Sequence, residues 1–384
     1  MAQEHLIELR VSADSHVSEP PDLWERGLPA KYRDDAPHFP KVQLGRGNHS
    51  RPGGWDPVER LKDMAVDGVS AEVLYPTLAK HIYDQAGHDI DLAAACERVY
   101  NDWMMEFCKE APDRLWGQAQ IGLWDMDFAV KELERAKKGG LQGATIWVVP
   151  PKGLPFTSDH YDPFWAAAQD LEMPVSMHIN AGFGFYAEAT EARGDDREDR
   201  IAGSARRAFG HKAAVAQAVT EMILSGVFER FAGLKFVLAE FEVGWIPFWL
   251  EDLDRKSGGG RKDGALTLTP SEYFNRQIYA TFTQDGVGGY LLQQWGADNF
   301  LWSNDYPHGG GVWPYSDETI ALTLGRVAPE AKAKVLSQNV AAVYGLPVPA
   351  PMPRQPAPDP ETLWPRPWLK REGEYTFAKT AMGL

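Results

Sequence analysis

Residues that can bind a divalent cation stand at the ends of four short apolar segments of the sequence. They are Asp14, His16, His178, Glu240 and Asp305. A charged residue at the end of an apolar strand is costly unless it is paired or bound to a cation, and His, Asp and Glu are common metal ligands. A cation held there would lower the pKa of a bound water, which could then attack an electrophilic carbon. These residue types indicate a metal-dependent enzyme.

The pattern of the whole sequence indicates how the segment ends can meet. Eight short apolar runs alternate with amphipathic stretches whose apolar residues recur every three or four positions. The runs cover residues 9–13, 71–76, 115–123, 143–149, 174–179, 234–240, 277–283 and 300–305. Eight βα units predict a (β/α)8 TIM barrel, whose active site gathers at the carboxyl ends of the strands. The rival, an open doubly wound sheet, lacks its usual G-x-G-x-x-G signature after the first run.

Each ligand-type residue also has an ordinary structural explanation. An Asp after a strand is commonly the N-cap of the next helix, and a single His is more often a hydrogen-bonded core residue than a ligand. Because side chains alternate along a strand, Asp14 and His16 point to the same side and both can reach the barrel axis. Four strand ends that supply ligand types on one face favour a metal site over these separate explanations.

The composition excludes several other classes of function. The chain has 384 residues and a net charge of −15, which gives no basic field for nucleic acid or for an anionic membrane surface. The N-terminus does not resemble a signal peptide and no apolar window is long enough to span a membrane, so we expect a cytoplasmic protein. Two cysteines, Cys96 and Cys108, cannot form an all-cysteine metal site. A metal must therefore be bound by His, Asp and Glu.

Three parts of the sequence lie outside the βα repeat. Residues 17–55 and 182–207 are predicted insertions over the barrel mouth, and residues 347–384 are a proline-rich extension to a barrel domain that covers residues 1–346. The chain also has 14 Trp, 13 Tyr and 17 Phe, and such a load often lines apolar ligand sites. We expect a small-molecule substrate with an apolar or aromatic body, contacted by Phe183, Phe185, Trp245, Trp302 and Trp313.

Longer motifs around these residues resemble the amidohydrolase superfamily. They are ADSHVSEPPDLW, MHIN, LSGVFERFAGLKFVLAEFEVGWIPFWLEDLD, SNDYPHGGGVWP and NVAAVYGL. They are most similar to the branch of aminocarboxymuconate-semialdehyde decarboxylase-like and γ-resorcylate decarboxylase-like enzymes, from about residue 9 to residue 346. The resemblance implies a (β/α)8 barrel that holds a divalent metal through Asp14, His16, His178 and Asp305.

The sequence departs from this family pattern at two positions. Asp14 replaces the first His of the usual H-x-H, which shifts the expected metal from Zn toward Fe or Mn. Glu240 stands where the decarboxylase members have a catalytic His, and a carboxylate there could ligate a metal or bridge two. The fourth run does not end in a lysine, so it offers no candidate for the carbamylated lysine that bridges two metal ions in other members of the superfamily. We expect one ion, and leave open a second one that uses Glu240 with Glu19 or His308 as outer ligands.

Three hypotheses of function follow. The leading one is a metal-dependent hydrolase that cleaves an amide, ester, thioester or activated C–C bond of a hydrophobic or aromatic carbonyl compound. In it Asp305, or otherwise Glu240, takes and returns the proton, and His308 hydrogen-bonds the substrate. The second is a metal-dependent non-oxidative decarboxylase of an aromatic or muconate-type acid, which the missing His weakens. The third is a non-catalytic ligand-binding barrel, for which we would expect an incomplete ligand set. The extension and the resemblance both favour a homodimer.

Overall fold

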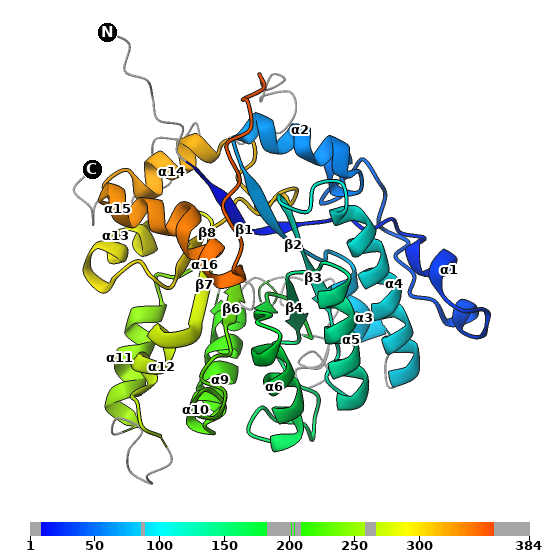
Figure 1. The fold of residues 1–384 in the computed structure, drawn as a ribbon, viewed down its shortest axis with the longest axis horizontal. Helices are drawn as coiled ribbons and strands as arrows, with labels where there is room; N and C mark the ends of the chain where they lie inside the picture. The colour runs from blue at the N-terminus through cyan, green and yellow to red at the C-terminus, as the bar shows by residue number, and fades with distance from the viewer. Residues whose placement is uncertain are drawn as a thin grey trace.

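The chain folds as eight parallel strands surrounded by helices (Figure 1). The structure is a computed structural model, and it describes residues 9–85, 89–182, 209–257 and 266–356 together with positions 201 and 203. The strands are β1 (Val11–His16), β2 (Ala71–Tyr75), β3 (Leu115–Gln120), β4 (Gly143–Ile146), β5 (Val175–His178), β6 (Phe236–Ala239), β7 (Ile278–Phe282) and β8 (Phe300–Trp302). Each pairs with the next along the chain. The predicted (β/α)8 barrel is confirmed.

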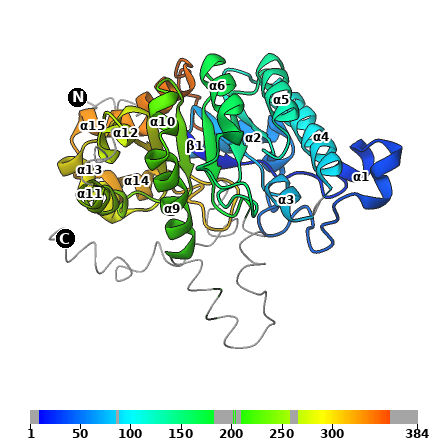
Figure 2. The same ribbon diagram turned by 90° about the horizontal axis from the view of Figure 1, so that it is seen from below.

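Helices connect the strands on the outside of the barrel, as the view from below shows (Figure 2). The described helices before β5 are α1 (Leu23–Gly27), η1 (Ala30–Asp35), η2 (Pro52–Gly54), α2 (Pro57–Asp67), η3 (Ala79–His81), α3 (Ile82–Gln85), α4 (Ile90–Cys108), α5 (Met126–Lys138), η4 (Asp159–Tyr161) and α6 (Asp162–Asp170). The later ones are α9 (His211–Leu224), α10 (Val227–Arg230), α11 (Ile246–Lys256), α12 (Pro270–Gln277), α13 (Gly286–Trp295), α14 (Ser316–Leu324), α15 (Pro329–Ala333), η7 (Lys334–Gln338) and α16 (Asn339–Tyr344).

Aspartates begin several of these helices. The residues whose carboxylates accept hydrogen bonds from first-turn amides of α2, α4, α5 and α13 are Asp56, Asp89, Asp125 and Asp285. Such a cap satisfies amides that have no partner within the helix. Asp14 lies inside β1, and Asp305 lies well before α14, the next helix. The N-cap explanation therefore does not account for either residue.

The strands separate two apolar layers. Leu301 belongs to the layer inside the barrel, whereas its neighbour Trp302 belongs to the layer between strands and helices. Val340 and Tyr344 of α16 belong to the inner layer. Lys235, just before β6, donates hydrogen bonds to two carbonyls of α16 (2.8 Å each). Helix α16 thus covers the amino ends of the strands and closes the floor of the barrel.

A seam of hydrogen bonds joins β1 to the segment that follows β8. The amide of Asp305 donates to the carbonyl of Asp14 (3.0 Å). The side chain of Asn304 reinforces this seam, because its Oδ1 accepts hydrogen bonds from Ser12 Oγ (3.0 Å) and Ser15 Oγ (2.9 Å). The register of β1 shifts between these two serines. The seam closes the barrel and sets the residues Asp14 and Asp305 side by side.

The first predicted insertion is a compact excursion. Residues 17–55 contain α1, η1 and η2, and α1 projects at one side of the molecule in both views (Figures 1 and 2). The amide of Ser18 donates to the carbonyl of Gly54 (2.7 Å), which holds the two ends of the excursion together. The second predicted insertion, residues 182–207, lies almost wholly outside the described residues.

The beginning of the C-terminal extension runs along α2 and α14. Arg354 pairs with Asp317 (2.9 Å), and the amide of Gln355 donates to the carbonyl of Ala65 (3.3 Å). The remainder of the extension, from residue 357, lies outside the described residues. The division at residue 346 therefore stays a prediction.

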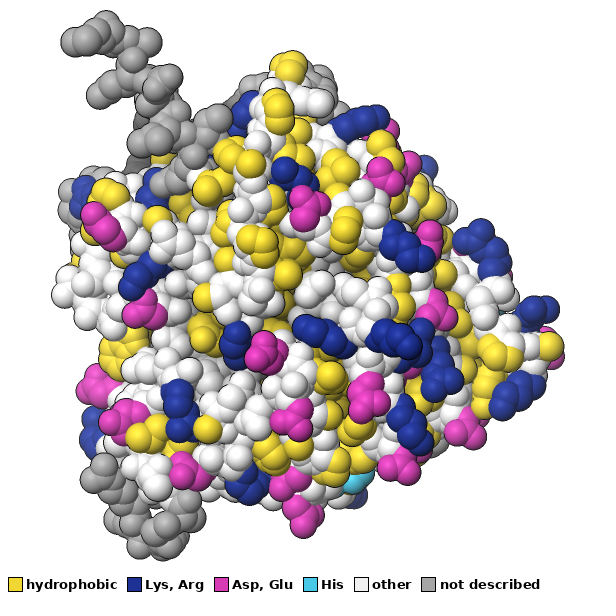
Figure 3. All heavy atoms as spheres, in the orientation of Figure 1, with side chains coloured by type: hydrophobic (Ala, Val, Ile, Leu, Met, Phe, Trp, Pro, Cys, Tyr) yellow, Lys and Arg dark blue, Asp and Glu magenta, His cyan; other side chains and the backbone are white. Residues whose placement is uncertain are grey.

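The surface carries charges of both signs. On the face seen in Figure 3, Lys and Arg side chains lie among Asp and Glu side chains. The acidic residues outnumber the basic ones, 54 to 39, over the whole sequence. Within the described parts of the chain, no helix has the length and the apolar character needed to cross a membrane.

Arg60 of α2 places a buried charge against the outside of the barrel. Its guanidinium forms an ion pair with Glu72 of β2, and both side chains are buried. Its Nη1 also donates to the carbonyl of His16 (2.7 Å), at the end of β1. Burial raises the pKa of Glu72, and the Arg60 charge opposes that rise. Arg60 therefore both compensates a buried carboxylate and fixes the strand end that carries His16.

We expect Arg60→Met to lower the free energy of unfolding by about 3–5 kcal/mol, because it leaves Glu72 buried without its partner. Arg26→Met is the matched control: Arg26 pairs with Asp22 on the surface, its side chain is 65% exposed, and its loss should cost less than about 1 kcal/mol. Urea denaturation followed by tryptophan fluorescence measures both. Equal losses in the two variants would contradict the role given to the buried pair.

Candidate functional site

Four strand ends deliver ligand-type side chains to one place at the mouth of the barrel. Asp14 and His16 lie at the end of β1, His178 ends β5, and Glu240 and Asp305 follow β6 and β8. Asp14, His16 and His178 have no exposed surface, and Asp305 is 3% exposed. Glu240 is half-buried. The structure thus brings together all five residues that the sequence indicated as metal ligands.

The distances within the cluster suit a shared cation. Nε2 of His16 lies 3.5 Å from Asp14 Oδ1 and 3.6 Å from Asp305 Oδ1. Nε2 of His178 lies 3.3 Å from Asp14 Oδ1 and 3.6 Å from Glu240 Oε2. With ligand bonds of about 2.1 Å, two ligands on opposite sides of one ion lie about 4.2 Å apart. These separations are within that limit.

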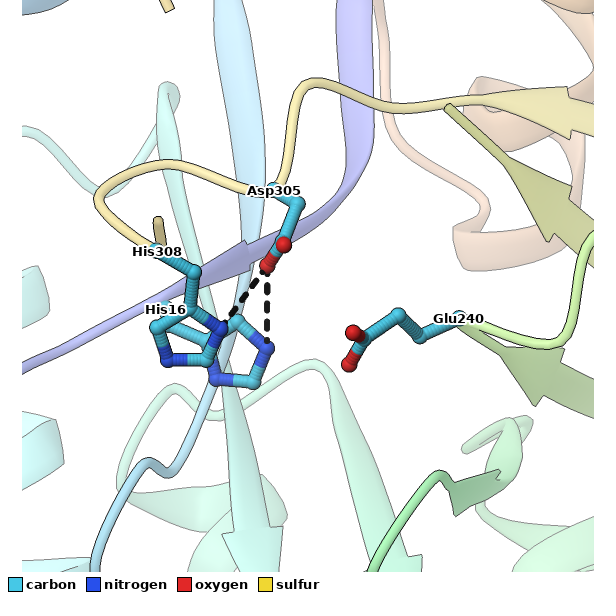
Figure 4. Close-up of side chains that lie close together, drawn as sticks. All are labelled: His16, Glu240, Asp305 and His308. Carbon is cyan, nitrogen blue, oxygen red and sulfur yellow. Dashed lines mark ion pairs between the residues drawn. The ribbon is translucent and has the colours of Figure 1, made fainter. Parts of the chain in front are cut away.

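The ligand atoms form two overlapping groups, each with all its members within 4.8 Å of one another. One group is Asp14, His16 and His178, and the other is His16, Glu240, Asp305 and His308. Figure 4 shows the second group, with Glu240 facing the two imidazoles across the site. Because His16 belongs to both groups, one ion near His16 could use ligands from either.

The two histidines present a bare nitrogen to the cluster. Nδ1 of His16 bonds the carbonyl of Pro76 (3.0 Å), and Nδ1 of His178 bonds the carbonyl of Ile179 (2.9 Å). A proton on each Nδ1 leaves a lone pair on each Nε2. Burial lowers the pKa of His16 well below its usual value and that of His178 to about 4, so both are neutral at pH 7. His16 Nε2 is buried and has no hydrogen bond to the described residues, as a metal ligand requires.

The carboxylates of the cluster are costly without a cation. Burial raises the pKa of Asp14 to about 7, although Lys80 and Thr281 oppose the rise. Burial, and then the charge of Asp305, raise the pKa of Glu240 to about 7. A divalent cation would offset these penalties, since it favours the ionised form of each carboxylate. The residues present therefore fit a divalent metal.

The backbone is strained where two of these carboxylates arise. Glu240 has φ of 65° and Asp305 has φ of 51°, a left-handed conformation that is uncommon for residues other than glycine. Such strain persists only where the surroundings enforce it, and it concentrates at functional sites. Here the amide of Glu240 donates to Thr281 Oγ1 (2.8 Å), and the amide of Asp305 is fixed by the seam to Asp14. The turns thus hold both carboxylates at the mouth.

His308 lies beside the cluster and is held on both sides. Its Nδ1 lies 3.0 Å from Asp305 Oδ1, and its Nε2 lies 3.0 Å from Thr77 Oγ1. Its ring stacks on that of His16, with centroids 3.9 Å apart. Burial lowers the pKa of His308 to about 3. Because the hydroxyl of Thr77 donates to the carbonyl of Val17, this neutral ring carries its proton on Nε2 and leaves a bare Nδ1 beside Asp305. A role for His308 in binding substrate stays a prediction.

Glu19, expected as an outer metal ligand, has a different environment. Its carboxylate accepts hydrogen bonds from the amides of Thr77 (3.2 Å), Leu78 (2.9 Å) and Ala79 (3.0 Å). Three successive amides bound to one buried carboxylate fix the turn that follows β2. Glu19 therefore anchors the backbone, and the expectation that it faces the metal is corrected.

The aromatic residues predicted to contact substrate are placed differently from one another. Trp302 is fully buried among the side chains between strands and helices, so its predicted contact with substrate is corrected. Trp313 is 4% exposed, donates to the carbonyl of Asp63 (2.9 Å) and packs against Tyr306. Trp245 is half-buried after β6 and stays a candidate. The other two, Phe183 and Phe185, lie outside the described residues.

The sequence analysis missed one charged residue of the site. Lys80 of η3 is 5% exposed, and its charge lowers the pKa of Asp14, His178 and Glu240, in each case after a larger effect of burial. The run that becomes β2 ends in Tyr75 and Pro76, so no ligand-type residue at its end drew attention to it. The only signal was a lysine in the turn after a strand end.

A (β/α)8 barrel with His and Asp ligands at its strand ends defines a class of metal-dependent barrel enzymes. Residues 13–346 match the family model described as Amidohydrolase, so the chain belongs to this family. Its relatives include the γ-resorcylate decarboxylase of Polaromonas sp., 27% identical over 58% of this chain and 69% of the relative. Another is the γ-resorcylate decarboxylase of Rhizobium sp., 26% identical over 65% of this chain and 76% of the relative.

Solved structures share the fold. An amidohydrolase from Mycobacterium avium subsp. paratuberculosis aligns with a TM-score of 0.72 and 20% identity, over 88% of this chain and 99% of that one. The 5-carboxyvanillate decarboxylase of Sphingomonas paucimobilis aligns with a TM-score of 0.65 and 23% identity, over 88% of this chain and all of that one. At these identities the likeness concerns the fold alone.

We expect Mn²⁺ to raise the thermal unfolding midpoint more at pH 8 than at pH 6. Without metal, the raised pKa values of Asp14 and Glu240 mean that the folded protein holds protons which the unfolded chain would release. Stability of the metal-free protein therefore falls as pH rises from about 4.5 through about 7. A bound cation offsets the cost of ionising Asp14 and Glu240, and it competes with the protons on these carboxylates. The free energy of metal binding therefore becomes more favourable by about 1.4 kcal/mol per displaced proton for each unit that the pH rises.

The matched control for this prediction is His178→Asn, which removes one imidazole ligand. Scanning fluorimetry with and without Mn²⁺ and elemental analysis measure the effect. The variant should show a much smaller shift at both pH values. An equal shift in the variant and the parent protein would contradict the assignment of His178 as a ligand.

Proposed function

We propose that this protein is a metal-dependent, non-oxidative decarboxylase of a small aromatic acid. The observation that carries the proposal is its kinship with γ-resorcylate decarboxylases at 26–28% identity, combined with a ligand cluster at the barrel mouth. Structures of decarboxylases with this fold contain manganese with 4-hydroxy-3-methoxy-5-nitrobenzoic acid or 2-nitroresorcinol. The leading hypothesis from the sequence was hydrolysis. These findings favour decarboxylation instead.

Decarboxylation of this kind needs no oxidant. The bond between the ring carbon and the carboxylate breaks, the electron pair stays on the ring, the ring carbon takes one proton, and carbon dioxide leaves. A divalent cation held by Asp14, His16, His178 and Asp305 would supply a Lewis acid for the oxygens of the substrate. Manganese is the first ion to test because related decarboxylases contain it, with zinc and iron as the alternatives.

Glu240 is the proposed proton donor. It stands where the family resemblance predicts a catalytic His, and burial, which raises its pKa to about 7 in the absence of a metal, opposes the preference of a bound cation for the ionised form. Its protonated fraction falls as pH rises, so turnover should fall as well. Asp305, which lies 3.0 Å from His308 Nδ1, is the alternative proton carrier.

Hydrolysis is kept as a second candidate because Glu240 could bind the metal instead of donating a proton. The carboxylate of Glu240 lies 3.6 Å from Nε2 of His178, close enough to act as a ligand rather than as a proton donor. Asp305 would then take the proton from an attacking water. A non-catalytic barrel is the weakest of the three hypotheses, because all five predicted ligands lie together. Homodimer formation and a cytoplasmic location stay predictions.

We expect the manganese-loaded protein to release carbon dioxide from at least one member of a panel of hydroxybenzoates that includes 2,6-dihydroxybenzoate. Mass spectrometry of ¹³CO₂ from carboxyl-labelled acids measures the product directly. A parallel panel of amides, esters and thioesters should yield no amine, alcohol or thiol. Turnover of the acyl panel without release of carbon dioxide would replace the decarboxylase proposal with the hydrolase.

Removal of the proposed proton carriers should slow turnover without unfolding the protein. Glu240→Gln should lower kcat by about 10²–10⁴-fold and keep its metal, whereas Asp305→Asn should lose both rate and metal affinity. Glu251→Gln is the control, since Glu251 is exposed on α11. A full rate for Glu240→Gln would exclude Glu240 as the proton donor.

A further inference from the structure

Lys80 lies in the turn that follows β2, at the carboxyl end of the barrel. It is 5% exposed. Its Nζ is not among the buried side-chain atoms that lack a hydrogen bond, so its stem is buried while its ammonium keeps contact with solvent. Among the residues that the structure describes, no carboxylate lies within 4.0 Å of Lys80 and no side chain accepts a hydrogen bond from it. An ammonium held in this way at the mouth of the barrel is suited to an anion that arrives from outside.

The turn that carries Lys80 is rigidly placed relative to the metal-ligand cluster. Glu19 binds the amides of three successive residues, the last of which, Ala79, directly precedes Lys80. Thr77 Oγ1 donates to the carbonyl of Val17 (2.6 Å) and lies 3.0 Å from His308 Nε2. His308 in turn contacts Asp305 (3.0 Å). The position of Lys80 is therefore tied to both β1 and the segment after β8.

The charge of Lys80 acts on the cluster from this position. After burial, it is the next largest influence on the pKa of Asp14, His178 and His308, and it lowers all three. With Asp14 and Asp305 ionised, Glu240 protonated as the proposed proton donor and one divalent cation bound, the cluster would carry no net charge. The ammonium of Lys80 would bring that sum to +1, which favours the entry of an anionic substrate.

We propose that Lys80 binds the carboxylate of the aromatic acid and selects acids over the corresponding phenols. This inference rests on the proposed function, because it concerns the substrate of the same site. An ion pair to the carboxylate stabilises the bound acid, and the charge leaves the carboxylate as carbon dioxide forms. Lys80 therefore contributes to binding of the substrate rather than to the transition state, and its loss should raise KM far more than it lowers kcat.

The test uses the manganese-loaded protein with 2-hydroxybenzoate as the acid and phenol as the matched probe without a carboxylate. Isothermal titration calorimetry should show that Lys80→Met weakens binding of 2-hydroxybenzoate at least tenfold and leaves phenol binding within twofold. Lys80→Gln, which keeps a polar head group without charge, should behave in the same way. Lys80→Arg should retain most of the affinity for the acid.

Lys235→Met is the matched control, because Lys235 is a half-buried lysine whose Nζ bonds carbonyls of α16 at the opposite end of the barrel. It should affect stability and leave both probes bound as in the parent protein. Elemental analysis and the thermal midpoint of each variant show that metal and fold are retained. If Lys80→Met does not fold, Lys80→Gln decides.

Equal affinity of the parent protein and the folded neutral variant for 2-hydroxybenzoate would overturn the proposal, as would equal losses for acid and phenol. Failure of the parent protein to prefer the acid over phenol would overturn it too. These outcomes differ from a failure of the proposed function. If acid binding depends on Lys80 but no carbon dioxide is released, the role of Lys80 is supported and decarboxylation is contradicted. If carbon dioxide is released and Lys80→Met has an unchanged KM, decarboxylation is supported and the role of Lys80 is contradicted.

Discussion

The hydrogen bond from the amide of Asp305 to the carbonyl of Asp14 is the contact on which the site depends. It joins the segment after β8 to the first strand, so the most distant parts of the barrel sequence become neighbours. Two carboxylates are thereby forced together in a place without solvent, where like charges cannot remain ionised at low cost. Two features of the site compensate for that crowding: a nearby ammonium, and a set of ligands, including neutral histidines, that suits a divalent cation.

The imidazoles are neutral because burial lowers their pKa values, and for His178 it does so more than the nearby carboxylates raise it. Both Nδ1 atoms bond backbone carbonyls at strand ends, so the rigid sheet itself determines which nitrogen faces the carboxylates. A protonated imidazole would offset a carboxylate but could not bind a cation. The fold thus leaves the positive charge to be supplied by a bound ion and by Lys80, rather than by His16 or His178.

The sequence was sufficient to predict the barrel and the position of its ligands, and the reason is geometric. Strand periodicity and the convergence of parallel carboxyl ends require only local patterns, and these placed Asp14, His178 and Asp305 together. The failures depended on packing. Leu301 faces the barrel axis, so the strict alternation along β8 turns Trp302 toward the helices. The role of Lys80 depends on the turn that Glu19 anchors. Those contacts join residues about sixty positions apart, so no periodic pattern in the sequence indicates them.

The packing of α16 against the amino ends of the strands limits how a small molecule can reach the ligand cluster. Among the described residues, Tyr344 and its neighbours fill the amino end of the barrel, so a small molecule reaches the ligand cluster from the carboxyl ends of the strands. Entry of one molecule and departure of another then use the same end of the barrel, so a bound molecule has to leave before the next one can reach the cluster.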